Sequence, residues 1–298
     1  MQNRIFLLLL SCASFFLTMT TAFRLLTRAQ AQTRFCKRGS MRMMSSGSSD
    51  NDAALCSVPR LPPLKNRYFA LRHGLSTANV AGIISSLPSV GTTIHGLTEE
   101  GKVQARAAAP DILEAIGGPE QLQNLVVYAS DFTRARETGE EAVDALWESF
   151  SGSPGGGSTG GGSGACAKAP VLEEVGLRER WFGDLDGEDV STYNDVWPLD
   201  LENAHHTTFG VESVNSVAGR IRDMFLRLEK KHSSAEGGVP ILLTSHADTL
   251  QIMQTYVANA DVRYFSQYRF KNGEVRPLLQ SPSSLPKPAP LQRDVSRV

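Results

Sequence analysis

Cysteine is scarce in this chain, and its four residues are poorly placed for a disulfide framework. Cys12 and Cys36 lie near the amino terminus, Cys56 precedes the first predicted strand, and Cys166 follows a Gly/Ser-rich stretch. Secreted proteins that depend on disulfides pair their cysteines inside the folded body. The chain also lacks the CxxC and Cys/His spacings of zinc sites. Cysteine usage therefore favours a reducing compartment and predicts no structural zinc.

Long apolar runs and an excess of positive charge are missing as well. After residue 22, no stretch is long and apolar enough to span a bilayer. The formal net charge is −1 at pH 7, but every charged residue before Asp50 is basic, so the rest of the chain is acidic. This balance argues against a nucleic-acid partner. The early basic residues are Arg4, Arg24, Arg28, Arg34, Lys37, Arg38 and Arg42.

The first 49 residues have the features of a two-part targeting sequence. Met1 to Ala22 combines a charged start, an apolar stretch and a small-residue exit, which is typical of a signal peptide. Residues 23–49 carry Arg and Ser but no acids, like a transit peptide. The join Thr21-Ala22-Phe23 resembles the bipartite presequences of algae with secondary plastids. We therefore expect a plastid location, with simple secretion or a retained membrane anchor as alternatives.

The remaining chain has room for one domain of roughly 200 residues. Residues 50–66 are polar and contain several prolines, which predicts a linker. Residues 67–280 form the expected domain. Residues 151–167 are rich in Gly and Ser and predict a flexible insertion. The Pro/Ser-rich residues 281–298 predict a disordered tail.

Apolar runs bounded by turn residues alternate with amphipathic stretches along the domain. The strands are expected at 67–72, 125–129, 170–173, 240–244 and 274–279. Helices are expected from Thr98 to Ile116 with a break at Pro110, from about 133 through Leu146, over 213–231, and behind the fourth strand. The segment around Trp197 is expected to be rich in loops. This alternation predicts an α/β fold with a mostly parallel central sheet.

Chemically versatile side chains come just after the ends of four of these strands. Arg72 and His73 follow the first strand, Arg134 the second, Glu179 the third and His246 the fourth. Because parallel strands present their carboxyl ends to one edge, we expect these side chains to converge there.

Two arginines, two histidines and one glutamate suit a tetrahedral dianion. A guanidinium group can donate two parallel hydrogen bonds to two oxygens of the same phosphate. A histidine flanked by arginine can take the phosphoryl group as a covalent intermediate, a transfer that needs in-line placement and charge neutralisation more than a metal. A carboxylic acid beside bound phosphate can protonate the leaving oxygen. No metal and no other cofactor is expected.

Five short motifs follow one another between Tyr68 and Leu279. They are Arg72-His73-Gly74-x-Ser76-x-x-Asn79, Leu97-Thr98-x-x-Gly101-x-x-Gln104-Ala105, Ser130-Asp131-x-x-Arg134-Ala135-x-x-Thr138, Leu177-x-Glu179-x-x-x-Gly183 with Asp186-Gly187, and Ser245-His246. This set resembles the signature motifs of the histidine phosphatase superfamily, the phosphoglycerate mutase-like proteins. The resemblance implies a three-layer α/β/α sandwich.

The resemblance also implies roles for the residues at the sheet edge. His73 would be the nucleophile and Glu179 the proton donor. The phosphate pocket would consist of Arg72, Arg134 and His246, with Asn79 lining it. Taken singly, each residue has a plainer interpretation: a core histidine, a helix-surface arginine, or one solvated acid among several nearby. The other acids in question are Glu173, Glu174 and Asp184.

The departures from the motifs bear on which reaction is expected. Ala247 replaces the glycine after the second histidine, no FTGW segment follows Asn79, and Glu179 to Gly183 reads ERWFG where ERHYG is the mutase pattern. We therefore expect hydrolysis of a small phosphorylated metabolite, with a phosphoglycerate mutase-type transfer and a non-catalytic phosphate-binding scaffold as alternatives. No nucleic acid, and no membrane after removal of the presequence, is expected as a partner.

The sequence also places features outside this set. The cluster Arg178-Glu179-Arg180 leaves room for a second anionic group on the substrate. Substrate-discriminating walls are expected from residues 75–94 and 184–209. The remaining histidines, His95, His205, His206 and His232, are interpreted as surface residues.

Overall fold

The computed structural model describes residues 57–151, 168–233 and 237–290. All of them belong to the compact unit that spans Ser49–Val298. The expected signal peptide and transit-peptide-like segment lie outside the described residues, as do most of the Gly/Ser insertion and the last part of the expected tail. Across the described ranges, no helix combines the length and the apolar character needed to cross a membrane.

The described parts of the expected linker and tail contact the domain. The Tyr256 hydroxyl donates to the carbonyl of Pro59 at 2.5 Å. The Gln280 amide group bridges to the linker, accepting from the backbone N–H of Leu64 at 2.9 Å. Further along, the backbone N–H of Ala289 donates to the carbonyl of Gln267 at 2.9 Å.

A five-stranded sheet in the order β3-β2-β4-β1-β5 forms the centre of the domain. The pairs β1–β4, β2–β4 and β2–β3 are parallel, and only β5 is antiparallel, at the edge beside β1. The expected mostly parallel sheet is thereby confirmed. The strands are β1 (Arg67–Arg72), β2 (Val126–Ala129), β3 (Val171–Glu173), β4 (Pro240–Ser245) and β5 (Val275–Leu278).

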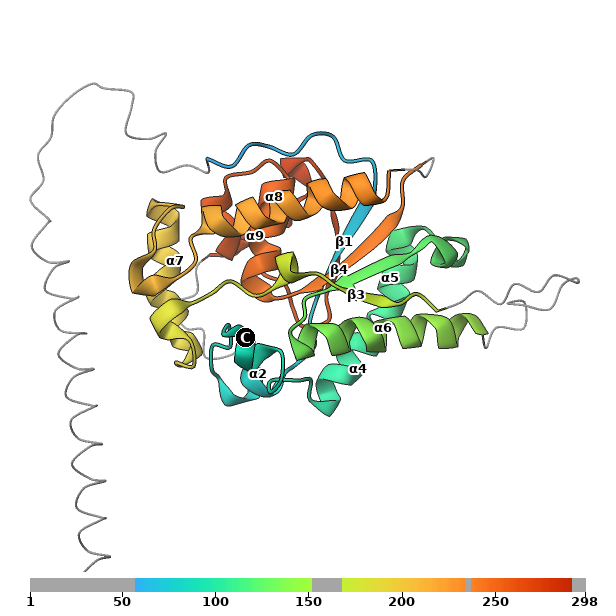
Figure 1. The fold of residues 1–298 in the computed structure, drawn as a ribbon, viewed down its shortest axis with the longest axis horizontal. Helices are drawn as coiled ribbons and strands as arrows, with labels where there is room; N and C mark the ends of the chain where they lie inside the picture. Colours follow the sequence, from blue (N-terminus) through green and yellow to red (C-terminus); the bar gives the residue numbers. More distant parts are fainter. Residues whose placement is uncertain (1–56, 152–167, 234–236, 291–298) are drawn as a thin grey trace, which may run out of the picture. The chain divides into compact units, whose positions relative to one another are not determined.

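Helices cover both faces of the sheet. Successive residues of a strand point to opposite faces, so each strand contributes side chains to two separate cores. Tyr68 and Ala70 of β1 join one core cluster, whereas Phe69 and Leu71 join the other. The first cluster contains the apolar faces of α8 (Val214–Lys231) and α9 (Ala247–Val257), and the second those of α5 (Ala109–Ile116) and α6 (Thr133–Ser151). Figure 1 shows α8 and α9 on one side of the strands and α6 on the other. The protein is a three-layer α/β/α sandwich.

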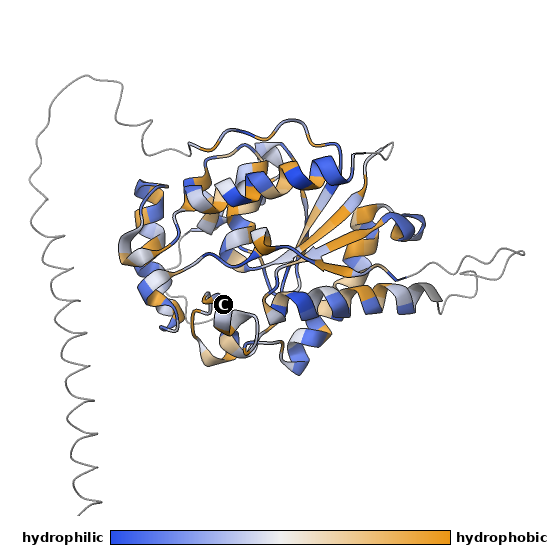
Figure 2. Cartoon of the chain, viewed as in Figure 1, coloured by the Kyte–Doolittle hydropathy of each residue, from blue (hydrophilic) through white to orange (hydrophobic). Residues whose placement is uncertain are grey.

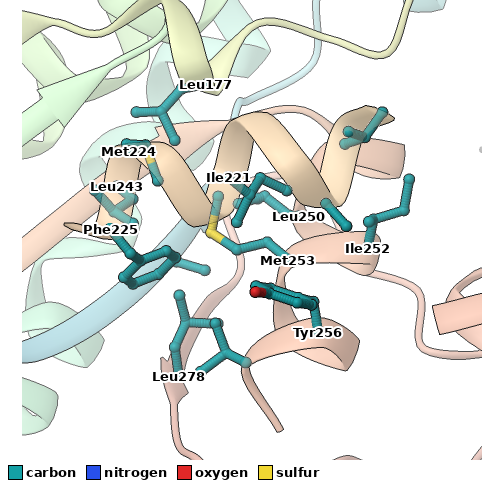
Figure 3. Close-up of a cluster of buried hydrophobic side chains, with 14 of the residues drawn as sticks. Leu177, Ile221, Met224, Phe225, Leu243, Leu250, Ile252, Met253, Tyr256 and Leu278 are labelled. Atoms are coloured by element: carbon teal, nitrogen blue, oxygen red, sulfur yellow. The ribbon is translucent and has the colours of Figure 1, made fainter. Parts of the chain in front are cut away.

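The packing of α8 and α9 against the sheet follows the helical spacing of their apolar residues. Figure 3 shows Ile221, Met224 and Phe225 of α8 beside Leu250 and Met253 of α9. Buried strands with both faces covered are apolar along their length, and Figure 2 shows this in the hydrophobic colour of the central strands. The carboxyl ends of these strands are where the polar residues begin.

Local sequence signals determine where the long helical segment before β2 begins and where it is interrupted. The Thr98 hydroxyl accepts from the backbone N–H of Gly101 at 3.0 Å and caps α4 (Glu99–Ala107). Pro110 lies in the first turn of α5, and Ala108 separates the two helices. The expected break is confirmed.

Three helices lie outside the segments where helices were expected: α2 (Thr77–Ala81), α3 (Pro88–Gly91) and α7 (Tyr193–Glu202). A capping box between Ser76 and Asn79 starts α2, and Gly82 ends it with φ 65°. The third helix, α7, contains Pro198 and is stabilised by buried Val196 and Trp197. Short 3-10 turns complete the chain: η2 (Pro119–Asn124), η3 (Val175–Leu177), η4 (Gly183–Leu185), η5 (Val190–Thr192), η6 (Thr208–Gly210), η7 (Val262–Gln267) and η8 (Pro282–Ser284).

Candidate active site

A cavity of about 210 Å³ lies at the carboxyl edge of the sheet. Arg72 and His73 follow β1, Arg134 lies in the first turn of α6 after β2, and Glu179 follows η3. The expected convergence of these side chains is therefore observed. The walls include Ser85 and neighbouring residues of 75–94 as well as residues of 184–209, the two segments expected to supply them.

His73 is held in a defined tautomer. The side chain is 3% exposed, and its Nδ1 lies 2.8 Å from the carbonyl oxygen of Gly74. Because a carbonyl oxygen can only accept, Nδ1 carries the proton and Nε2 carries the lone pair. Burial, followed by the positive charges of Arg134 and Arg72, holds the pKa of His73 well below its usual range. The imidazole is thus neutral, with its lone pair on Nε2.

Two buried arginines flank this nitrogen. Nε of Arg134 donates to Nε2 of His73 at 3.3 Å, and its Nη2 donates to the carbonyl of Ser85 at 2.9 Å. Burial lowers the pKa of Arg134 to about 10, against the opposing negative charge of Glu179, so the guanidinium stays charged at neutral pH. Arg72 donates from Nη1 to the carbonyl of Phe270 at 2.7 Å. Its Nε is buried without a hydrogen-bond partner among the described residues.

His246 lies against His73 and is fully buried. The two ring centroids are 5.2 Å apart in an edge-on arrangement. Nε2 of His246 is 3.0 Å from the hydroxyl of Ser130, while its Nδ1 has no hydrogen-bond partner in the described structure. Buried polar atoms are normally paired. The unpartnered nitrogens of His246 and Arg72 are consistent with a site that an oxyanion completes.

The loop after His73 is clamped by two helices. The backbone N–H and hydroxyl of Thr98 both donate to the carbonyl of Leu75, at 2.9 and 3.1 Å. The backbone N–H of Gly74 donates to the hydroxyl of Thr138 on α6 at 3.1 Å. A Cβ on Gly101 would lie 2.1 Å from the Leu75 carbonyl oxygen, and one on Gly74 would lie 2.2 Å from the Gly101 oxygen. Only glycine permits this backbone approach.

Glu179 and Asn79 line the cavity, as expected for them. The Oε1 atom of Glu179 accepts from the backbone N–H groups of Arg180 at 2.9 Å and of Thr249 at 3.3 Å; the Thr249 hydroxyl lies 3.2 Å from it but donates to the nearer Arg178 carbonyl at 2.8 Å. The Oδ1 atom of Asn79 accepts from the backbone N–H and hydroxyl of Ser76. Asn79 therefore also builds the capping box of α2. The other acids weighed as proton donors, Glu173, Glu174 and Asp184, do not line this cavity.

Several cavity residues were not singled out individually from the sequence. Asp248 and Gln251 come from α9, and their spacing after the fourth strand gave a signal that could have placed them. Trp197 and Tyr193 come from α7, with ring centroids 4.9 Å apart and planes 10° from parallel. The Arg269 guanidinium lies 4.9 Å from the centre of the Trp197 ring. No sequence pattern around Arg269 indicated that it reaches the cavity.

The expectation that Arg178 and Arg180 serve a second anionic group was wrong. Arg178 forms an ion pair with Asp131 at 2.5 Å, and Arg180 is fully buried against Asp200 at 2.7 Å. Neither arginine lines the cavity. A buried cation without a partner is costly, so Arg180 requires Asp200; Arg178 is partly exposed and is held by Asp131.

The interpretation of His206 as a surface residue was also wrong. Its side chain is 8% exposed and Nε2 lies 2.7 Å from Oδ1 of Asp200. His95 is half-buried, with Nδ1 2.7 Å from the hydroxyl of Ser85 at the cavity wall. Within the described ranges, no three His, Cys, Asp or Glu side chains are grouped so that they could hold a metal ion.

Comparison with the profiles of known protein families gives one match that covers most of the domain. The profile of the histidine phosphatase superfamily (branch 1) matches residues 68–150 and 162–283. The chain belongs to this superfamily. Its signature residues His73, Arg134 and His246 all fall within the matched ranges.

Several solved structures have a fold similar to that of this chain. A mycobacterial glucosyl-3-phosphoglycerate phosphatase in complex with VO3 has a TM-score of 0.53 and 21% identity, over 71% of this chain and 90% of that chain. Its native form has a TM-score of 0.52 and 22% identity, over 71% and 89%. A protein described as mycobacterial hydrolase 2 has a TM-score of 0.53 and 19% identity, over 78% and 86%. No curated protein matched the chain.

Proposed function

We propose that this protein is a phosphatase that hydrolyses small phosphomonoesters through a phosphohistidine intermediate on His73. The arrangement of His73 carries the proposal: Nδ1–H is fixed by the Gly74 carbonyl, and Nε2 accepts from Nε of Arg134, both residues lining the cavity. A neutral, oriented imidazole next to fixed positive charge is suited to attack a phosphorus atom. Membership of the histidine phosphatase superfamily supports the same chemistry.

The reaction has two halves. In the first, Nε2 of His73 forms a bond to phosphorus while the ester P–O bond breaks, and the leaving oxygen takes a proton from a cavity carboxyl. In the second, a water oxygen attacks phosphorus and gives a proton to that carboxylate, while the N–P bond breaks and its electron pair returns to Nε2. Inorganic phosphate then leaves.

The charges needed to stabilise the transferring phosphoryl group come from side chains. Arg72 and Arg134 supply two guanidiniums at the cavity, and His246, which lies against His73 just outside the residues lining the cavity, has an Nδ1 without a hydrogen-bond partner among the described residues. Phosphoryl transfer depends mainly on positioning and on neutralising the equatorial oxygens. We therefore propose that turnover needs no metal ion, so that its rate is unchanged when a chelator is added.

The size and lining of the cavity support a small leaving group. Its volume of about 210 Å³ is below the ~300–1,000 Å³ typical of drug-sized sites. On the α9 side, Gln251 is 3% exposed and its Oε1 is buried without a hydrogen-bond partner in the described structure. An unpaired buried acceptor is costly. We propose that a hydroxyl of the leaving group donates to this oxygen.

Hydrolysis is favoured over mutase chemistry by the use of the nearby cations. A mutase must hold its product while the phosphoryl group returns to a second oxygen, which calls for a second anion-binding group. Arg178 and Arg180, the candidates that the sequence offered for that role, are paired with Asp131 and Asp200, and Arg269 at the cavity wall lies over the Trp197 ring. Water is therefore the acceptor we expect.

The test is to trap the intermediate. Incubation with a ³²P-labelled phosphomonoester, followed by rapid denaturation, should yield an acid-labile and base-stable phosphoprotein. His73→Ala should lose both the label and turnover, whereas His232→Asn, remote from the cavity, should keep both. Wild-type turnover by the His73→Ala protein would refute the proposal. Phosphate transfer between substrate hydroxyls that outpaces release to water would indicate a mutase instead.

A further inference from the structure

A serine hydroxyl at the cavity wall is held by a histidine that lies outside the cavity. Ser85 is buried and lines the cavity. Its Oγ atom lies 2.7 Å from Nδ1 of His95, whose half-buried ring is not part of the cavity lining. This short hydrogen bond therefore connects the wall of the cavity to a titratable group behind it.

The backbone on both sides of the Ser85 side chain is fixed. The backbone N–H groups of Ser86 and Leu87 both donate to Oδ1 of Asp186, at 2.6 and 2.9 Å. The carbonyl of Ser85 accepts from Nη2 of Arg134 at 2.9 Å. Since the backbone is held in this way, the direction of the Ser85 hydroxyl proton depends on the partners of Oγ.

The Ser85 hydroxyl is close to the atom that attacks phosphorus in the proposed reaction. Nε of Arg134 donates to Nε2 of His73 at 3.3 Å, and Nη1 of the same guanidinium donates to Oγ of Ser85 at the longer distance of 3.5 Å. The hydroxyl and Nε2 are thus partners of one planar group. A phosphoryl oxygen bound beside this guanidinium is therefore a candidate acceptor for the Ser85 hydroxyl.

A count of protons shows when Ser85 can donate into the cavity. A serine hydroxyl has one proton to donate and two lone pairs that accept. The Arg134 guanidinium can only donate, so it uses one lone pair. If Nδ1 of His95 carries a proton, it uses the other lone pair and the hydroxyl proton is left for the cavity. If Nδ1 carries a lone pair instead, the hydroxyl can turn away from the cavity and donate to it.

We propose that His95 is a positioning residue, whose Nδ1–H donates to Ser85 and thereby directs the Ser85 hydroxyl proton to an oxygen of the bound phosphoryl group. This inference rests on the proposed phosphatase reaction, because it adds one donor to the same phosphate site. Phosphoryl transfer depends on positioning and on stabilising the equatorial oxygens. Ser85 would supply a neutral donor there in addition to the guanidiniums, and His95 acts through Ser85 without touching the substrate.

Charged groups on the elements around His95 influence its protonation. Burial and then the positive charge of Arg134 lower the pKa of His95 from its usual value, and the Asp186 carboxylate opposes them. Glu137 of α6 lies beside the same segment, where its Oε2 accepts from the backbone N–H of Leu97 at 2.7 Å. A bound dianion adds negative charge and favours the doubly protonated ring, in which Nδ1 can only donate. Binding of the dianion and protonation of His95 should therefore support each other.

Sulfate is the probe for this arrangement, because it is tetrahedral and stays doubly charged between pH 5 and 8. Its dissociation constant is measured by calorimetry at pH 6. Ser85→Ala should weaken sulfate binding about tenfold or more, which is typical of losing a hydrogen bond to a charged group. His95→Leu should weaken it about threefold to tenfold, because the hydroxyl is no longer directed into the cavity.

The double variant shows whether His95 acts through Ser85. Ser85→Ala combined with His95→Leu should bind sulfate within about twofold of Ser85→Ala alone, because coupled residues do not contribute additively. His232→Leu is the matched control and should bind sulfate like the wild type. The ring of His232 also contacts a hydroxyl, that of Tyr128 at 3.0 Å, but neither residue lines the cavity.

His95→Asn provides a readout that a purely structural role would not change. Asparagine offers an amide N–H near the position of Nδ1 but does not titrate. The wild type should lose affinity for sulfate as the pH rises from 5.5 to 8, since the neutral ring can accept the Ser85 hydroxyl proton. His95→Asn should bind within about threefold of the wild type at pH 5.5, and its loss of affinity up to pH 8 should be at least about threefold smaller.

Three outcomes would overturn the proposal: losses that multiply in the double variant, equal pH dependence in the wild type and His95→Asn, or equal weakening in His95→Asn and His95→Leu. If His95→Leu does not fold, as judged by its thermal unfolding, the pH comparison with His95→Asn alone decides. The phosphatase reaction is tested separately by the labelled intermediate on His73. A labelled wild type without the expected sulfate pattern removes only the role of His95, whereas an unlabelled wild type refutes the reaction itself.

Discussion

Arg180 and Asp200 form a two-pronged ion pair in which neither side chain is exposed to solvent, with N–O distances of 2.7 and 2.8 Å. Asp200 lies on α7, which carries Trp197 at the cavity wall, while Arg180 directly follows Glu179. The pair therefore fixes the distance between two sides of the active site. Nε2 of His206 completes the arrangement, 2.7 Å from Asp200.

Replacing Arg180 with methionine should strongly destabilise the protein. The change leaves the Asp200 carboxylate buried without its principal cation, which in other proteins costs about 3–5 kcal/mol. We expect a loss of that order in the free energy of unfolding, measured by urea titration at pH 7.5. Arg178→Met is the matched control, because its pair with Asp131 is partly exposed and should contribute about 1 kcal/mol or less. Equal losses in the two variants would contradict this interpretation.

Arg134→Lys should impair catalysis without comparable loss of stability. An ammonium group cannot contact both His73 and the Ser85 carbonyl, as the guanidinium does. We expect kcat/KM to fall about 10²-fold, a magnitude typical of losing one fixed charge at a transition state. Arg136→Lys is the control, since Arg136 is on the same helix but forms outward pairs with Glu140 and Glu173. A loss below about threefold in Arg134→Lys would argue against a phosphate-binding role.

Gln251→Leu should discriminate between substrates by their leaving groups. If a substrate hydroxyl donates to the buried Oε1, the variant should lose about 10–100-fold in kcat/KM for a polyhydroxylated phosphomonoester, equivalent to ~1–3 kcal/mol. Phenyl phosphate has no hydroxyl to donate and serves as the internal control, with an expected change below about threefold. The comparison is made at pH 6 in one buffer. Parallel losses on both substrates would mean that Gln251 acts only through the fold.

Acidification should destabilise the protein through its two buried histidines. The folded state holds the pKa of His73 and of His246 well below 6.5, mainly by burial. Below pH 6.5 the unfolded chain therefore binds more protons, so the free energy of unfolding falls as the pH decreases, by up to ~1.4 kcal/mol per pH unit for each histidine. Asp248, whose pKa is raised in the folded state, contributes in the opposite direction below about pH 7.

Single variants separate these contributions. In urea titrations between pH 7.5 and 5, His246→Asn should show a shallower decline than the wild type, by about one proton. Asp248→Asn should show a steeper decline, because the opposing contribution is removed. His232→Asn serves as the control, since that ring is only partly buried. An unchanged slope in His246→Asn would show that this ring is already charged in the folded protein.

The sequence was sufficient to predict the framework of the site. Residues 68–71 are apolar and followed at once by Arg72-His73-Gly74, and the same pattern at β4 located His246. These features depend on local patterns: strand burial, strand ends and the direction of parallel strands. The capping of α4 by Thr98 and the break near Pro110 are equally local, and both were predicted.

The far wall of the cavity depends on contacts that no local pattern encodes. Trp197 was placed in a loop because α7 has weak apolar periodicity and contains Pro198; tertiary packing against Tyr193 and Asp248 makes it a helix. The charges of Arg178 and Arg180 were visible, but their partners Asp131 and Asp200 are distant in sequence, by 47 and 20 residues. Only the three-dimensional structure shows that these cations are already neutralised.

The contact between Gly74 and Gly101 makes the nucleophile sensitive to a helix that never reaches the substrate. One extra methyl group at Gly101 would push against the Leu75 carbonyl, next to the residue that fixes the tautomer of His73. The geometry of the imidazole can therefore be disturbed from the outer layer of the domain. Helix α4 supports the loop that carries His73 from behind, so any side chain at position 101 is expected to displace that loop.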